Sequence, residues 1–167
     1  MKKIFVDMDG VLSDFNQYYT KLFGRTPSEV KKDANRHLYG ELWDEFVDTQ
    51  AFAKLQWHAG AKELVAYLNS LTGVQLCVLT SAGGFHRQRH VQAQKMQWLL
   101  SRDIMWPAVV VPGRKYKSGF ASEDSLILDD TKDVCTDFIA AGGSAIHVQP
   151  WLYPGVNVIE EIKLWLQ

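Results

Sequence analysis

The sequence predicts an α/β fold built on a parallel sheet of five strands, and three observations indicate it. Short apolar runs rich in branched residues recur along the chain, as expected of strands that are buried on both faces. Segments with apolar residues at helical spacing separate these runs. The chain has 167 residues, a length that suits one core domain with a small insertion. Alternating strands and helices imply right-handed crossovers, so we expect a three-layer, Rossmann-type arrangement with helices on both faces of the sheet.

The expected elements follow in chain order. The strands are 4–6, 74–79, 108–111, 125–128 and 145–148, each bounded by polar residues or glycine. Apolar residues on one helical face mark a helix over 61–71 before the second strand, and a helix containing Lys95 follows that strand. Residues 134–139 form a further helix, which Gly142-Gly143 ends. Ile159, Ile162 and Leu166 mark the closing helix.

The segment from residue 13 to residue 58 interrupts the alternation of strands and helices. It contains no convincing strand, and Thr26-Pro27-Ser28-Glu29 is a capping box with proline at the first helical position. We therefore expect residues 13–58 to form a small helical cap, inserted after the first strand into a core made of residues 1–12 and 59–167.

Charge and composition exclude several functional classes. The formal net charge is −1, so no overall field draws the protein to nucleic acid or to an anionic membrane, and neither is expected as a stable partner. The apolar run near the N-terminus is too short for a signal peptide, and no run is long enough to span a bilayer. Cys77 and Cys135 are expected to be free thiols. These features predict a cytoplasmic protein, and they do not determine its oligomeric state.

Two carboxylates, Asp7 and Asp9, follow the first strand, and Gly10 allows the chain to turn away after them. In a doubly wound sheet, ligands bind beyond the carboxyl ends of the strands. Two neighbouring buried acids repel each other unless a cation neutralises them. The pair therefore indicates a metal-assisted site, whereas a solvated acidic junction between strand and loop is the alternative.

Polar residues also follow the second and fourth strands. Thr80-Ser81 place two hydroxyls at a strand end ahead of small residues, where hydroxyls and backbone amides can hold a phosphate. Asp129-Asp130 end the fourth strand, although either residue could instead cap the next helix. The intervening loop, residues 113–117, brings cations to the same edge of the sheet.

Acids, hydroxyls, a lysine and acids again, in this order at strand ends, resemble the four motifs of the haloacid dehalogenase superfamily of phosphotransferases. The opening, Asp7-Met8-Asp9-Gly10-Val11-Leu12-Ser13-Asp14-Phe15, is similar to that of the 5'(3')-deoxyribonucleotidases, as are Thr80-Ser81 and Leu126-Ile127-Leu128-Asp129-Asp130. The segment from Gln50 to Leu55 resembles the exit of that family's cap. Two departures are Ala82, where the family usually has proline, and a slightly longer stretch from Lys115 to Asp129.

The resemblance implies a Mg²⁺-dependent phosphomonoesterase acting on (deoxy)nucleoside monophosphates through an aspartyl-phosphate. Asp7 would be the nucleophile and Asp9 the general acid and base. The Asp7 carboxylate, the Asp9 backbone carbonyl and Asp130 would hold Mg²⁺, with Asp129 orienting this set from behind. Groups that would bind the phosphate are Thr80, Ser81, Lys117 and Lys95, with Lys115 as a rival to Lys117.

Aromatic residues of the cap hold the nucleobase in the resembled family. Phe15, Phe46 and Phe52 align best with those positions and Tyr39 is a further candidate, whereas the alternative for each is the helical core. Three other functions stay open: a phosphatase for another small phosphomonoester, one for the terminal phosphate of a polynucleotide, and a catalytically degenerate binding module.

Overall fold

A parallel five-stranded sheet forms the centre of the molecule. The computed structural model describes residues 1–149 and 154–167. The strands lie in the order β3-β2-β1-β4-β5, and every neighbouring pair is parallel. Their bounds are β1 (Lys3–Val6), β2 (Gln75–Ser81), β3 (Ala108–Val111), β4 (Ser125–Asp129) and β5 (Ser144–His147). The predicted fold class and all five predicted strands are thereby confirmed.

β2 extends beyond its predicted end. The apolar run stops at Leu79, but Thr80 and Ser81 still pair with Val110 and Val111 of β3. The backbone N–H of Ala82 continues this ladder by donating to the Val111 carbonyl at 2.8 Å. A proline at position 82, as in the resembled family, would lose that hydrogen bond.

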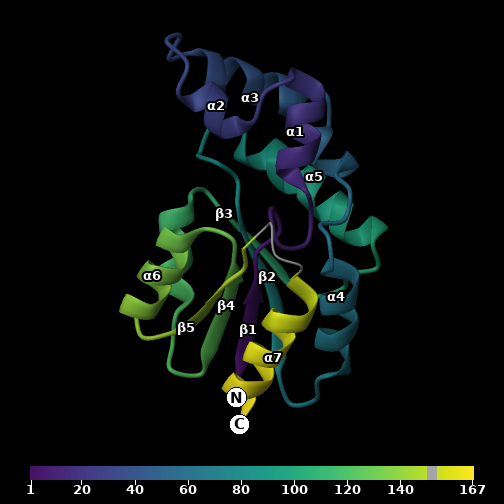
Figure 1. Cartoon of the computed structure of the whole chain (residues 1–167), viewed down its shortest axis with the longest axis vertical. Coiled ribbons are helices and arrows are strands. Elements are labelled where there is room, and N and C mark those ends of the chain that lie inside the picture. The colour runs from purple at the N-terminus through teal and green to yellow at the C-terminus, as the bar shows by residue number, and fades with distance from the viewer. Residues whose placement is uncertain (150–153) are drawn as a thin grey trace.

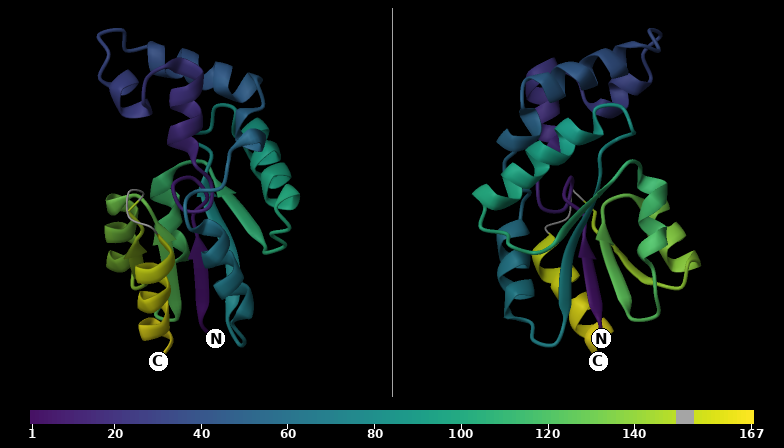
Figure 2. Two further views of the ribbon diagram at one scale, coloured as in Figure 1. Left: turned by 45° about the vertical axis from the view of Figure 1, so that its right-hand side comes forward. Right: turned by 180° about the vertical axis from the view of Figure 1, so that it is seen from behind.

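Alternate residues of the strands belong to two separate apolar layers, and helices cover both faces of the sheet (Figures 1 and 2). Ile4 and Val6 face the larger layer, where α4 (Ala61–Ser70), α5 (Gln88–Ser101) and α7 (Pro154–Leu166) pack. Phe5 faces the smaller one, which contains residues of α6 (Lys132–Ala140) and is flanked by η2 (Arg114–Phe120). The sheet is therefore the middle layer of three, as the near-continuous apolar strands predicted.

The segment proposed as the cap contains α1 (Phe15–Phe23), α2 (Pro27–Lys31), α3 (Leu38–Asp48) and the short helix η1 (Ala51–Lys54). The predicted capping box begins α2, with reciprocal hydrogen bonds between Thr26 and Glu29. Helices α1 to α3 stand beyond the carboxyl ends of the strands (Figure 1).

Polar contacts join α3 to the start of α5. The His86 Nε2 lies 2.9 Å from Asp44 Oδ1, and Arg87 forms ion pairs with Asp44 and Asp48. The buried Gln94 amide donates to the Val47 carbonyl at 2.7 Å. These contacts fix α3 over the sheet edge where the predicted site residues lie.

In the part of the chain that the structure describes, no helix combines the length and the apolar character that crossing a membrane requires.

Candidate active site

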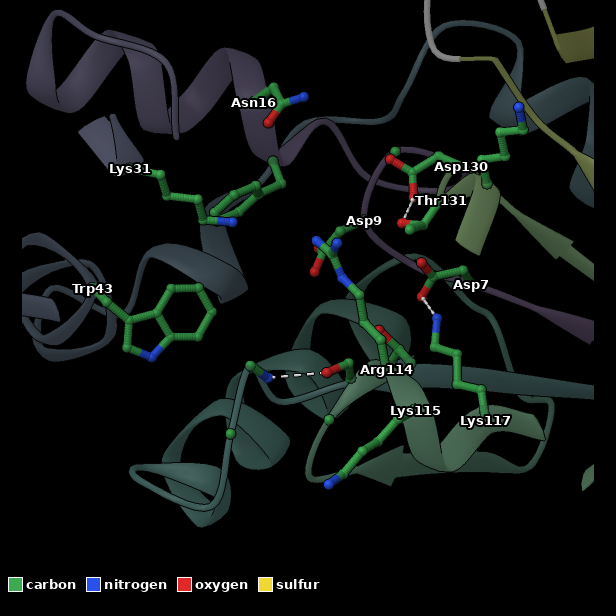
Figure 3. A pocket seen from close by; sticks show the side chains of 18 of the residues that line it. Asp7, Asp9, Asn16, Lys31, Trp43, Arg114, Lys115, Lys117, Asp130 and Thr131 are labelled. Carbon is green, nitrogen blue, oxygen red and sulfur yellow. Dashed lines mark hydrogen bonds and ion pairs between the residues drawn. The ribbon is translucent and has the colours of Figure 1, made fainter. Parts of the chain in front are cut away.

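The residues singled out at the strand ends meet at one cavity of about 880 Å³ (Figure 3). From the sheet edge and its loops it is lined by Asp7, Asp9, Thr80, Ser81, Lys117 and Asp130. From the proposed cap it is lined by Phe15, Asn16, Lys31, Tyr39 and Trp43. The cavity therefore lies where a doubly wound sheet binds its ligands.

Asp7 and Asp129 share one buried cation. The Lys117 Nζ lies 2.9 Å from Asp7 Oδ1 and 2.7 Å from Asp129 Oδ2, and the lysine is 1% exposed. Burial by itself would lower the pKa of Lys117, but attraction to the two carboxylates outweighs it and raises that pKa. Lys117 is therefore a fixed positive charge against the Asp7 carboxylate.

The hydrogen bonds of Asp7 distinguish its two oxygens. Oδ1 accepts from the backbone N–H of Met8 at 2.7 Å in addition to facing Lys117. Oδ2 forms no hydrogen bond with the residues that the structure describes. The carboxylate is thus held by one oxygen, and the other can react or bind a metal.

Three carboxylates, those of Asp7, Asp129 and Asp130, each offer an oxygen within 4.8 Å of the others. Burial and the charge of Asp7 raise the pKa of Asp130 to about 7 and that of Asp129 to about 6. A divalent cation would remove this repulsion, and carboxylate oxygens are the ligands that Mg²⁺ prefers. The donor set therefore fits the predicted Mg²⁺.

Asp129 and Asp130 differ in their remaining contacts. Both oxygens of Asp129 have protein donors, because Oδ2 faces Lys117 and Oδ1 accepts from the Thr131 backbone N–H at 2.9 Å. The Asp130 carboxylate accepts from the Thr131 hydroxyl at 3.3 Å and lines the cavity. Asp130 is therefore the better placed of the two to ligate a metal, and Asp129 the better placed to orient the site.

Gly10 leaves room for the Asp130 side chain at this edge of the sheet. Its φ is +82°, a conformation that side chains disfavour, and a Cβ there would lie 2.3 Å from Asp130 Oδ2. The turn after Asp9 therefore depends on glycine for two separate reasons.

Asp9 is held by Ser13 and Lys95. The Ser13 hydroxyl donates to Asp9 Oδ1 at 3.1 Å, and the Lys95 Nζ lies 2.7 Å from Asp9 Oδ2. Lys95 also donates to the Thr80 hydroxyl at 2.8 Å and to the Ser81 carbonyl at 2.9 Å. With its fully buried lysine, this network fixes the direction of Asp9, whose side chain stays 26% exposed.

The three lysines considered for phosphate binding occupy different places. Lys117 lines the cavity beside Asp7, whereas Lys95 lies behind Asp9 and Thr80 and is not among the lining residues. Lys115 lines the cavity from an exposed position, and its amine lies 5.2 Å from the centroid of the Tyr116 ring. Lys117 is therefore the buried lysine that faces the cavity, whereas Lys95 is buried outside its lining.

Of the predicted aromatic residues, Phe15 lines the cavity and so does Tyr39. Phe46 and Phe52 are fully buried, pack against each other at 4.9 Å between ring centroids, and do not line it. The helical core, the alternative left open for these residues, describes the positions of Phe46 and Phe52.

Trp43, which no sequence motif singled out, also lines the cavity. It is half-buried on α3, between Phe15 at 6.2 Å and Tyr39 at 6.3 Å between ring centroids. Its ring packs on the backbone of Gly83, where a Cβ would lie 2.6 Å from the indole. The spacing of Tyr39, Trp43 and Phe46 at helical intervals carried a signal for one apolar face, but not for which of the three faces the cavity.

Lys31, Arg114, His58 and His147 are further lining residues that the sequence reading did not single out for a role. His147 ends β5, and its Nε2 lies 3.0 Å from the Asp130 carbonyl. His147 lies inside the expected strand 145–148 and Lys31 lies on a helix of the proposed cap, so neither position carried a signal for the site.

Solved structures share this architecture, although no protein-family model and no curated protein matches the sequence. A D,D-heptose 1,7-bisphosphate phosphatase from Burkholderia thailandensis is 15% identical, with a TM-score of 0.50 over 86% of this chain and 75% of that one. A candidate beta-phosphoglucomutase from Thermotoga maritima is 16% identical, with a TM-score of 0.57 over 97% of this chain and 100% of that one. At such identities the similarity concerns the arrangement of elements, and the chain has the haloacid dehalogenase-like α/β fold that its motifs predicted.

Proposed function

We propose that this protein is a Mg²⁺-dependent phosphomonoesterase that forms an aspartyl-phosphate on Asp7. The observation that carries the proposal is the convergence, at one cavity, of Asp7, Asp9 and Asp130 with a buried lysine against the nucleophile. Each group of the predicted constellation has chemistry to perform there, which supports an active enzyme over a degenerate binding module.

Asp7 would attack the phosphorus in line and form an acyl phosphate as the alkoxide leaves. Lys117 lies against the Asp7 carboxylate and offers positive charge next to the phosphoryl group during transfer. The Ser81 side chain lines the same cavity and can donate to a phosphoryl oxygen. The Thr80 hydroxyl, which accepts from Lys95, helps fix the same strand end.

Asp9 would donate a proton to the leaving alkoxide and afterwards remove one from the water that hydrolyses the acyl phosphate. Both steps require a carboxyl group that points at the same place throughout. The contacts with Ser13 and Lys95 meet that requirement, since they hold Asp9 from two sides while it remains accessible from the cavity.

Mg²⁺ would be held by the Asp7 carboxylate, the Asp9 backbone carbonyl and Asp130, with Asp129 orienting the set through Lys117 and Thr131. When bound, it supplies positive charge that offsets the repulsion between the acids and the phosphate.

The substrate that we propose is a nucleoside monophosphate, by preference a deoxyribonucleotide. Phe15, Tyr39 and Trp43 place aromatic surface on the cap side of the cavity, where a base attached to the reacting phosphate can stack. Another small phosphomonoester or a polynucleotide terminal phosphate is the second candidate, because the cavity opens between a small cap and the sheet edge.

Phosphate release tests the enzyme and its substrate in one assay. Purified protein should release phosphate from p-nitrophenyl phosphate when Mg²⁺ is present, and a panel of deoxy- and ribonucleoside 5'- and 3'-monophosphates should contain better substrates. Absence of release from every compound would contradict the proposed activity. Release that is no faster from nucleotides than from p-nitrophenyl phosphate would contradict the nucleotide assignment.

Metal dependence should separate Asp130 from Asp129. Asp130→Asn should raise the Mg²⁺ concentration at half-maximal rate by roughly 100-fold or more, because it removes a ligand charge. Asp129→Asn should raise it by about 10-fold, as expected for a residue that orients ligands. A titration of Mg²⁺ against initial rate measures both values. Ca²⁺ should inhibit because of its larger and looser coordination, and full activity in excess chelator would be incompatible with the assignment.

Base stacking should depend on Trp43. Trp43→Ala should lower the ratio of kcat/KM for the best nucleotide to kcat/KM for p-nitrophenyl phosphate by about 5- to 150-fold, since stacking on a base contributes roughly 1–3 kcal/mol. Trp106→Ala, which removes a half-buried indole bonded to Asn69 outside the cavity, is the matched control and should leave the ratio unchanged. If this ratio of kcat/KM values were the same in Trp43→Ala and Trp106→Ala, Trp43 would not be part of the base-binding site.

A further inference from the structure

Lys31 and Arg114, like Lys115 and Lys132, line the cavity without forming an ion pair among the described residues. Figure 3 shows the charged ends of Lys31 from α2 and Arg114 from η2 pointing into the cavity. Lys95 and Lys117, by contrast, are fully engaged with Asp9, Asp7 and Asp129.

The two cations are close enough to repel each other. The Lys31 amine lies over the Tyr39 ring, 4.7 Å from its centroid, although Lys31 as a residue is exposed at the cavity mouth. Partial burial of that amine and the neighbouring charge of Arg114 lower the pKa of Lys31. A bound anion would reverse the repulsion, because it would attract both groups.

The position of this pair separates it from the phosphoryl-transfer groups. Lys31 belongs to the proposed cap, and Figure 3 shows its amine apart from Asp7 and Lys117. The transferred phosphate already has Lys117 and the proposed Mg²⁺ beside Asp7. An anion bound by Lys31 is therefore a different group of the same substrate.

We propose that Lys31 and Arg114 form a second anion subsite, which binds a second phosphate group of the substrate. This inference rests on the proposed phosphatase function and extends its substrate from a nucleoside monophosphate to a nucleotide that carries a second phosphate besides the one removed. The aromatic residues Tyr39 and Trp43 flank the subsite, so base and second phosphate would be bound on the same side of the reacting group. The second phosphate can be a monoester, as in a nucleoside 3',5'-bisphosphate, or the diester of an oligonucleotide end.

Kinetics with matched substrates test the subsite. We compare kcat/KM for 2'-deoxyadenosine 3',5'-bisphosphate with that for the better of its two monophosphates, in wild type, Lys31→Gln and Lys32→Gln. Lys32 is the neighbouring exposed lysine and does not line the cavity, which makes it the matched control. Wild type and Lys32→Gln should prefer the bisphosphate by about 10-fold, the effect of one charge-assisted hydrogen bond. Lys31→Gln should bring that ratio close to one.

A third substrate, a deoxyadenosine dinucleotide with a 5'-phosphate, separates the two sources of the second phosphate. A preference equal to that for the bisphosphate assigns the subsite to a phosphodiester, and a preference for the bisphosphate alone assigns it to a phosphomonoester. No preference in wild type for either compound overturns the proposal, as does a ratio that Lys31→Gln leaves unchanged.

Binding keeps the test independent of turnover. In isothermal titration of the Asp7→Asn protein, the bisphosphate should bind about 10-fold more tightly than the monophosphate, and adding Lys31→Gln should abolish the difference. If p-nitrophenyl phosphate is not hydrolysed, the proposed function fails, and this titration still decides the subsite. Equal affinities for the two ligands would overturn it.

Discussion

Replacing Asp7 by asparagine should lower phosphatase activity by roughly 1000-fold or more while the protein stays folded. An amide is too weak a nucleophile to form the acyl phosphate, so the covalent step is lost. The fold should persist because asparagine has the same shape as aspartate. The substitution also removes the negative charge of Asp7, which repels those of Asp129 and Asp130. Steady-state phosphate release from p-nitrophenyl phosphate measures the loss, and thermal unfolding checks the fold.

Asp14→Asn provides the matched control for this change. Asp14 lines the same cavity and caps α1 by accepting from the Gln17 backbone N–H, a role that asparagine fills equally well. The activity of the Asp14→Asn protein should stay within a few-fold of wild type.

Mass spectrometry after acid quenching should find phosphate on Asp7 of the wild type, and beryllofluoride should bind there. A Asp7→Asn protein that retained a tenth of wild-type turnover would rule out the covalent mechanism.

Replacing Lys117 by methionine should affect both stability and activity. The lysine is 1% exposed between Asp7 and Asp129, so methionine would leave two buried carboxylates without their cation. Removing one partner of a buried ion pair costs about 3–5 kcal/mol of unfolding free energy. Urea denaturation without Mg²⁺ measures this loss. Activity should fall by about 100-fold or more, since the charge next to the transferring phosphoryl group is lost as well.

Lys115→Met in the same helical turn separates this buried charge from a general effect of removing a cation. Lys115 is exposed and contacts the Tyr116 ring, so the free energy of unfolding should change by no more than about 0.5 kcal/mol. Equal losses of stability in Lys115→Met and Lys117→Met would show that the ion pairs with Asp7 and Asp129 do not carry the stability of this edge.

The sheet could be predicted because its signal is local. Each strand is a short apolar run, and the first polar residues that follow mark its carboxyl end. This local pattern is sufficient to place Asp7, Thr80 and Asp129 at one edge of the sheet. The predicted end of a strand is less exact where hydrogen bonding to a neighbouring strand, rather than hydrophobicity, decides how far the strand extends. β2 continues to Ser81 because β3 supplies hydrogen-bond partners that the apolar pattern does not contain.

The surroundings of each lysine were decided by the tertiary structure. Lys95, Lys115 and Lys117 are the same residue type near the same edge, and composition and spacing cannot tell which amine is buried against an acid. Folding brings Lys95 beside Asp9 across 86 positions and Lys117 beside Asp129 across 12, while Lys115 stays exposed. Burial and charge pairing, which are long-range properties, separate a positioning lysine from one that faces the substrate.

By itself, the sequence determined the α/β class and showed which strands are followed by acids and which by hydroxyls. These features follow from local apolar patterns and from the motif residues next to them. Only the tertiary structure decided which cap residues face the cavity. Phe46 and Trp43 lie three positions apart on α3, yet the first is buried among aromatic rings and the second packs over Gly83 at the cavity. That Lys31 faces the cavity was likewise decided by the tertiary structure. The face that a helix turns toward a cavity depends on the elements that pack against its other faces, and these elements lie elsewhere in the chain.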